Sequence, residues 1–179
     1  EGELNIGPND WGSGSLTLSL AGNRLLVRRT DTAVEVASVA IAELTSVMIV
    51  GRDAADDELV IDFSGGLPLL KGVTFAGGTG SDTVQLSGLI SSATSIHDDL
   101  TTEGTVVTSV DGKLITMTGL ERLVDMLSSV NRSVTLGATA DRITFSDVGS
   151  SADGQSRLAL LGGSTIEFRH PTGGLTVNA

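Results

Sequence analysis

A short cassette recurs along this chain and restricts its possible folds more than any other feature. Each copy has an apolar-x-apolar run, a glycine, a polar loop, and then Asp-x-apolar-x-apolar. Three copies are clear, at residues 48–61, 73–86 and 134–145. Short alternation of apolar and polar residues, bounded by Gly, Asp and Ser, is the signal of half-buried β-strands. We therefore predict an all-β chain.

The residues between the strands of each cassette have a defined physical role. Glycine supplies a positive φ, or lets another backbone approach closely, where the chain turns. An aspartate before the next strand can hydrogen-bond to its own backbone two residues on and so close a turn. The alternation that follows places three pairs of apolar side chains each on one strand face: Leu59 and Ile61, Val84 and Leu86, Ile143 and Phe145.

Self-similar strand–turn–strand units indicate stacked coils. The cassette loops lack a two-residue Asn-Gly or Asp-Gly turn, which weakens the case for tight hairpins. We favour an irregular parallel β-helix (β-solenoid), with an antiparallel β-sandwich as the alternative. Residues 1–179 are expected to form a single β-solenoid-like domain. Because the sequence stops as the strand pattern of residues 175–177 ends, we expect this domain to be a fragment of a larger protein.

Two segments depart from the strand pattern. Leu120, Leu123, Val124 and Leu127 have helical spacing, and Thr118 with Glu121 matches a capping box. The sequence therefore predicts one short helix near 119–130, with an irregular solenoid turn as the alternative. Residues 91–104 have no strong period and are predicted to form a loop.

Composition excludes several classes of protein. The chain has no cysteine, so it can form neither a disulfide framework nor a thiolate metal site. Its formal net charge is −11, from 22 acidic and 11 basic residues, which argues against a nucleic-acid partner. No apolar run reaches the roughly 18 residues of a membrane span.

One motif suggests a cation site. Residues 77–85 read Gly-Gly-Thr-Gly-Ser-Asp-Thr-Val-Gln and match the nonapeptide G-G-x-G-x-D-x-U-x in full. The segment resembles the haemolysin-type (RTX) calcium-binding repeats of large secreted bacterial proteins, and the cassettes resemble repeat modules of bacterial cell-surface proteins. The resemblance implies that Asp82 gives Ca²⁺ a carboxylate ligand, while Gly77, Gly78 and Gly80 shape a carbonyl cradle. Only one strict copy is present, so it supplies a calcium half-site.

Other candidate groups are less specific. Asp53, Asp56, Asp57 and Glu58 share one loop and could hold a cation or act as an acid–base pair, or simply form a solvated acidic loop. His97 precedes Asp98, and a His–Asp pair can orient a base for a serine nucleophile; a surface-loop histidine is the alternative. Trp11 could stack on a sugar if it were exposed, or belong to the core.

No established catalytic motif occurs, so we expect a non-catalytic structural or adhesive module of an extracellular or cell-surface bacterial protein. A polysaccharide lyase or glycosidase on a β-helix scaffold is the first alternative, with Arg52, Asp56 and Asp57 as its candidate residues. A protein-interaction module is the second. The expected partners are neighbouring domains of the same chain, surface proteins or glycans.

Overall fold

The computed structural model describes residues 2–12, 14–66, 72–88, 93–100, 104–137, 142–161 and 163–178, and it is all-β. In these residues the helical elements are two 3-10 turns, η1 (Pro8–Asp10) and η2 (Ile41–Glu43). The strands form two sheets, here sheet A and sheet B. Sheet A contains, in spatial order, β1 (Gly2–Ile6), β5 (Leu44–Val50), β7 (Val73–Ala76), β11 (Lys113–Thr118), β10 (Thr105–Val110), β9 (Ala93–Leu100), β13 (Ser129–Leu136) and β17 (Gly174–Asn178). Sheet B contains β14 (Ile143–Asp147), β15 (Gln155–Leu160), β16 (Thr165–Arg169), β12 (Arg122–Asp125), β8 (Thr83–Ser87), β6 (Glu58–Asp62), β2 (Ser15–Ala21), β3 (Arg24–Arg29) and β4 (Glu35–Ala40).

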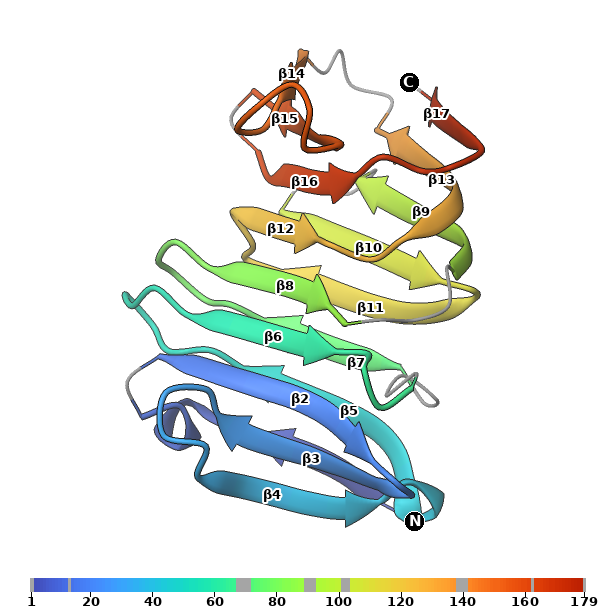
Figure 1. Ribbon diagram of the computed structural model, residues 1–179. Coiled ribbons are helices and arrows are strands. Elements are labelled where there is room, and N and C mark those ends of the chain that lie inside the picture. Colours follow the sequence, from blue (N-terminus) through green and yellow to red (C-terminus); the bar gives the residue numbers. More distant parts are fainter. Residues whose placement is uncertain are drawn as a thin grey trace.

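The chain crosses from sheet A to sheet B several times, and strands from successive crossings lie side by side (Figure 1). In sheet A, Val73 of β7 pairs in parallel with Val47 of β5 on one side and Ile115 of β11 on the other. In sheet B, Val84 of β8 pairs in parallel with Leu59 of β6 and with Leu123 of β12. Each cassette therefore joins strands of two different sheets and is not a hairpin.

Both sheets are mixed, because three antiparallel excursions interrupt the parallel order. They are β2–β3–β4 and β14–β15–β16 in sheet B, and β9–β10–β11 in sheet A. The turn between β10 and β11 is Asp111-Gly112, with φ of 47° and 79°. Positive φ at both central residues is typical of the tight type I′ hairpin turn. Both sheets keep open edges, β1 and β17 in sheet A and β14 and β4 in sheet B.

The core lies between the two sheets and follows the alternation of the strands. Leu59, Ile61, Val84 and Leu86 are fully buried, as the cassette pattern predicts. Trp11 is also fully buried: its Nε1–H donates to Val50 O at 2.7 Å, and its ring centroid lies 6.0 Å from that of Phe75. The core assignment of this tryptophan is therefore confirmed.

The helix predicted near 119–130 is wrong. That segment contains β12 and the beginning of β13. Leu123 pairs on one side with Val84 and on the other with Ile166, so neighbouring strands on both sides satisfy the backbone of β12. Glu121 caps no helix, because its carboxylate accepts the Asp82 N–H. Tertiary pairing outweighs the local helical spacing here.

Candidate functional site

The four residues of the predicted calcium half-site lie in one turn, between β7 and β8. This turn packs between the β5–β6 turn, which begins at Gly51, and the β11–β12 turn, which begins at Gly119. Gly51 N–H donates to Ala76 O and Gly77 N–H donates to Thr118 O, so the backbone ladder of sheet A continues to the start of each turn. We call these three stacked connections the turn stack.

Acidic side chains hydrogen-bond one turn to the next along this stack. Asp82 Oδ1 accepts the Asp57 N–H at 2.9 Å, and Glu121 Oε2 accepts the Asp82 N–H at 2.7 Å. These acidic residues directly precede β6, β8 and β12, whose first residues pair with one another. Each carboxylate therefore satisfies a backbone donor that stacking would otherwise leave unpaired.

The glycines of the motif are required by close packing. A Cβ at Gly77 would lie 2.3 Å from Gly119 O and 2.6 Å from Asp82 Oδ2. At Gly80, where φ is +149°, a Cβ would lie 2.2 Å from Ala55 O. Gly78 has a φ of +99°. The Gly-Gly-x-Gly run thus lets neighbouring turns approach more closely than any side chain would allow.

The same turn presents only part of what calcium needs. Gly77 O lies against Gly51 in the preceding turn and Gly78 O lies against Gly119 in the following one, so these two carbonyls lie on opposite sides of the turn. Asp82 is fully buried, and its Oδ2 has no hydrogen-bond partner in the described part of the chain. Ca²⁺ takes six to eight oxygen ligands. The described residues include no group of three or more His, Asp or Glu side chains that could hold a metal.

Asp82 also has an altered acidity. Burial raises the pKa of its carboxyl, the hydrogen bond from the Asp57 N–H lowers it, and the nearby carboxylates of Asp57, Glu121 and Asp56 raise it further. The net pKa lies above the ordinary value. The folded state therefore favours the protonated carboxyl, and ionising Asp82 at neutral pH costs stability.

This environment predicts different effects for two substitutions at Asp82. Asp82→Ala should lower the free energy of unfolding by about 1–3 kcal/mol, because it leaves the buried Asp57 N–H without an acceptor. Asp82→Asn keeps an oxygen for that N–H and removes the charge, so we expect it to match or exceed the wild type in stability at pH 7. Urea unfolding of the three proteins measures both effects. Equal losses in the two variants would contradict this account.

The loop that precedes Asp82 in the stack uses its acidic groups for internal contacts. Arg52 Nε donates to Asp57 Oδ1 at 2.8 Å, and Asp56 Oδ1 accepts the Ser81 N–H at 2.9 Å. Asp53 Oδ1 lies 3.2 Å from the Cβ position of Gly78. The structure therefore brings together Arg52, Asp56 and Asp57, the candidate lyase residues, but it binds two of their carboxylate oxygens to neighbouring turns or to each other.

Both histidines hydrogen-bond to serine. His97 Nδ1 lies 2.8 Å from Ser133 Oγ, and His170 Nε2 lies 2.7 Å from Ser156 Oγ. His97 does not pair with Asp98, because adjacent strand residues face opposite sides of a sheet. The Asp98 carboxylate is fully buried and is bound by Thr108 and Arg132. The proposed His–Asp orientation of a base is thus not formed.

A buried ionic cluster joins the two sheets and was not anticipated from the sequence. Arg132 of β13 donates to Asp98 Oδ2 of β9 at 3.0 Å and to Asp125 Oδ2 of β12. All three residues are at most 1% exposed. The guanidinium carbon lies 4.9 Å from the ring centroid of Phe168, a cation–π geometry. Burial raises the pKa of Asp125, and Arg132 counteracts it without reversing the net direction.

A second ionic cluster lies at the surface of sheet B. Glu167 Oε2 accepts from Arg122 at 2.6 Å, and its Oε1 accepts from Arg157 at 2.9 and 2.6 Å. Burial raises the pKa of this carboxyl, but the hydrogen bonds and charges of the two arginines outweigh burial and hold the pKa below its ordinary value. The folded state therefore favours the ionised form of Glu167.

The Glu167 cluster gives a stability contribution with a defined pH range. It is fully present above about pH 4.5, the ordinary carboxyl pKa, and is lost as pH falls through the lower folded value. We expect Glu167→Gln to cost about 1–2 kcal/mol at pH 7. Thermal unfolding of both proteins between pH 7 and pH 3 should show the difference shrinking in acid. A difference independent of pH would assign the effect to packing.

Comparison with protein-family models, curated proteins and solved structures finds no match to this chain. Among the residues that the structure covers, no helix has the length and apolar character needed to cross a membrane. The assignment of function therefore depends on the geometry of the turn stack and the two ionic clusters.

Proposed function

We propose that this chain is a non-catalytic structural module of an extracellular or cell-surface bacterial protein, built as an irregular parallel β-helix. The turn stack is the observation that carries the proposal. Its conserved-type elements within this one chain, a glycine at the start of each turn and an acid at the end, serve to join one coil to the next. Asp57, Asp82 and Glu121 are all engaged in this way.

The parallel pairing of β5, β7 and β11 in sheet A, and of β2, β6, β8, β12 and β16 in sheet B, supports the same proposal. Stacked coils make a scaffold in which each coil contacts mainly its neighbours. Such a scaffold holds surface loops at fixed separations. Adhesion to surface proteins or glycans through those loops is part of the proposal.

A screen for catalysis tests the non-catalytic assignment. The purified chain is incubated with uronate-containing polysaccharides, and unsaturated products are followed by their ultraviolet absorbance. We expect no turnover above a buffer control. Turnover that disappears in Arg52→Ala but persists in Arg28→Ala, an exposed arginine outside the turn stack, would establish the lyase alternative instead.

The calcium half-site is a separate part of the proposal. The supporting observation is the unpartnered, buried Asp82 Oδ2. Bound calcium predicts a rise in the thermal unfolding midpoint at millimolar CaCl₂, measurable heat in calorimetric titration, and loss of both in Asp82→Asn. Absence of heat and of a thermal shift in the wild type would remove calcium from the proposal and leave the scaffold role unchanged.

A further inference from the structure

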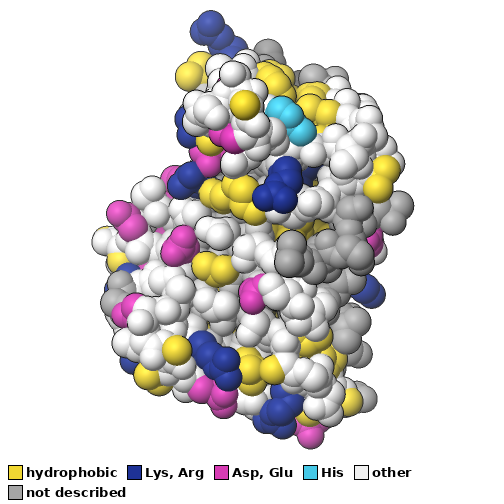
Figure 2. Space-filling model, in the orientation of Figure 1, with side chains coloured by type: hydrophobic (Ala, Val, Ile, Leu, Met, Phe, Trp, Pro, Cys, Tyr) yellow, Lys and Arg dark blue, Asp and Glu magenta, His cyan; other side chains and the backbone are white. Residues whose placement is uncertain are grey.

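The hydrophobic core is open at the C-terminal end of the sheets. Among the described residues eight large hydrophobic side chains are exposed, and five of them lie on β14, on β17 or in the turn after β15. In Figure 2 hydrophobic side chains appear at the top of the molecule, which is this end. The five are Ile143, Phe145, Leu161, Leu175 and Val177.

Strand register shows that four of these side chains belong to the inward rows of the sheets. Phe145 of β14 is opposite Leu158 of β15, and Leu158 is fully buried whereas Phe145 is 54% exposed. The Phe145 ring centroid lies 6.2 Å from that of Phe168, inside the core. Ile143 lies on the same strand face as Phe145, because the two residues are two positions apart.

Sheet A ends in the same way. Val177 of β17 pairs with Val134 of β13, which is fully buried, yet Val177 is 39% exposed. Leu175 shares its strand face and is 37% exposed. The core therefore continues to the last strand of both sheets, and nothing within the described residues covers it. An exposed apolar patch of this kind is typical of an interaction surface.

The opposite end of the molecule is different. The edge strand β4 begins at Glu35, which pairs with Arg28 at 3.6 Å. The apolar residues of this end, such as Leu4, Ala37 and Val39, are partly buried against the core. Charged edges with few exposed apolar side chains are a common protection against further strand pairing. The docking surface is thus confined to the C-terminal end.

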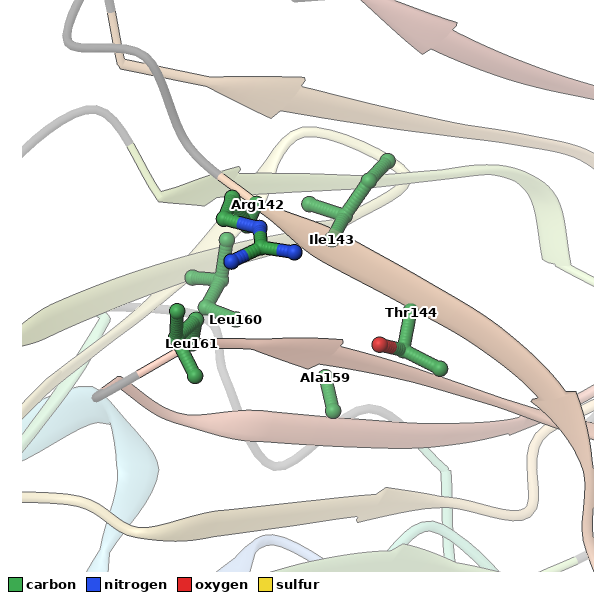
Figure 3. Close-up of a pocket in the computed structure, with 6 residues that line it drawn as sticks. All are labelled: Arg142, Ile143, Thr144, Ala159, Leu160 and Leu161. Atoms are coloured by element: carbon green, nitrogen blue, oxygen red, sulfur yellow. The ribbon is translucent and has the colours of Figure 1, made fainter.

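The β14 edge is complementary to itself in charge. Arg142 lies immediately before the strand and Asp147 is its last residue. Antiparallel pairing of two β14 strands centred on Phe145 places Ile143 opposite Asp147 and Thr144 opposite Ser146. It also brings Arg142 of each copy to the strand end that carries Asp147 of the other. Figure 3 shows Arg142 and Thr144 beside the shallow hollow on this hairpin, close to Ala159.

We propose that the C-terminal end binds a second copy of this chain, through antiparallel pairing of β14 with β14 of the partner. The partner's apolar row covers Ile143 and Phe145, and the free backbone groups of both β14 edges pair with each other. A two-fold arrangement of this kind uses one surface twice and closes after two copies. The inference deepens the proposed scaffold role, because it makes the scaffold a two-ended rod.

Sedimentation equilibrium of the wild-type chain tests the inference first. We expect a monomer–dimer equilibrium with a dissociation constant on the order of micromolar, and no larger species. A strict monomer at roughly 500 µM, some hundredfold above that constant, would overturn the inference. An open series of oligomers would also overturn it, because head-to-tail stacking does not close. Either result leaves the scaffold proposal standing, since the turn stack does not depend on association.

Charge exchange then tests the geometry. Arg142→Asp and Asp147→Arg should each weaken the dimer by about tenfold or more, because each places like charges together. The double variant should recover most of the wild-type affinity. Failure of the double variant to recover would contradict the two-fold pairing. Val34→Asp, at an exposed position on the N-terminal side of β4, is the matched control and should leave the dimer unchanged. Thermal unfolding of each variant verifies that it is folded.

Discussion

Replacing Arg132 by methionine is expected to lower the free energy of unfolding by about 3–5 kcal/mol at neutral pH. The substitution leaves the carboxylates of Asp98 and Asp125 buried in the core without their cation. The Thr108 hydroxyl and the Leu127 N–H would still donate to them, but these neutral donors do not offset two buried negative charges. Urea unfolding at pH 7 measures the loss.

The pH dependence identifies the cause of that loss. Without Arg132, the pKa values of both carboxyls rise above their ordinary value, because burial and mutual repulsion favour the protonated forms. The folded variant then binds more protons than the unfolded chain, so its stability falls as pH rises through those raised values. We therefore expect the variant to be closest to the wild type near pH 4.

Two control variants complete the Arg132 experiment. Arg28→Met removes an exposed arginine that pairs with Glu35 at 3.6 Å, and should change stability by less than about 0.5 kcal/mol. Adding Asp98→Asn and Asp125→Asn to Arg132→Met removes the unpaired charges and should restore much of the lost stability. If the triple variant is no more stable than Arg132→Met, unpaired charge is not the cause.

Replacing Gly77 by alanine should destabilise the fold by about 2–3 kcal/mol. The new Cβ would meet Gly119 O and the Asp82 carboxylate, both closer than van der Waals contact permits. The first of these atoms belongs to the backbone of the next coil, so the clash separates the stacked turns. Chemical denaturation measures the loss, and hydrogen exchange should show faster exchange at the Gly77 N–H.

Gly7→Ala is the matched control for Gly77→Ala. Gly7 has a φ of −99°, and its Cβ would find only Asp10 Oδ2, at 3.9 Å. The substitution should change stability by less than about 0.5 kcal/mol. A similar loss in both variants would mean that the general flexibility of glycine, and not the close approach of two turns, explains the effect at Gly77.

The sequence predicts the strand content and much of the core. Alternation in the cassettes correctly identifies Leu59, Ile61, Val84 and Leu86 as buried, because a strand with one buried face imposes period two. The Asp111-Gly112 turn was also readable, since this dipeptide is a strong hairpin signal. The third cassette is covered only in part, because its Asp141 lies outside the described residues.

Other elements could not be predicted from local pattern. Residues 93–100 were expected in a loop but form β9, because the inward positions of Ile96, Asp98 and Leu100 include a charged residue. Asp98 is tolerated there only because Arg132, 34 residues later in the chain, donates to it. The same holds for the acids of the turn stack, whose partners lie 25 and 39 residues away. Such pairings depend on the register of the sheets and leave no local signal.

The central claim is that successive cassettes stack side by side, with each cassette joining two different sheets. Pairs of introduced cysteines test it directly, because the chain has no native cysteine. Thr74 pairs with Thr116 on the neighbouring strand, whereas Gln85 would face Thr74 only if β7 and β8 formed a hairpin. A short thiol-to-thiol cross-linker should join the pair Thr74→Cys with Thr116→Cys, and not Thr74→Cys with Gln85→Cys. The reverse result would contradict the stacked arrangement.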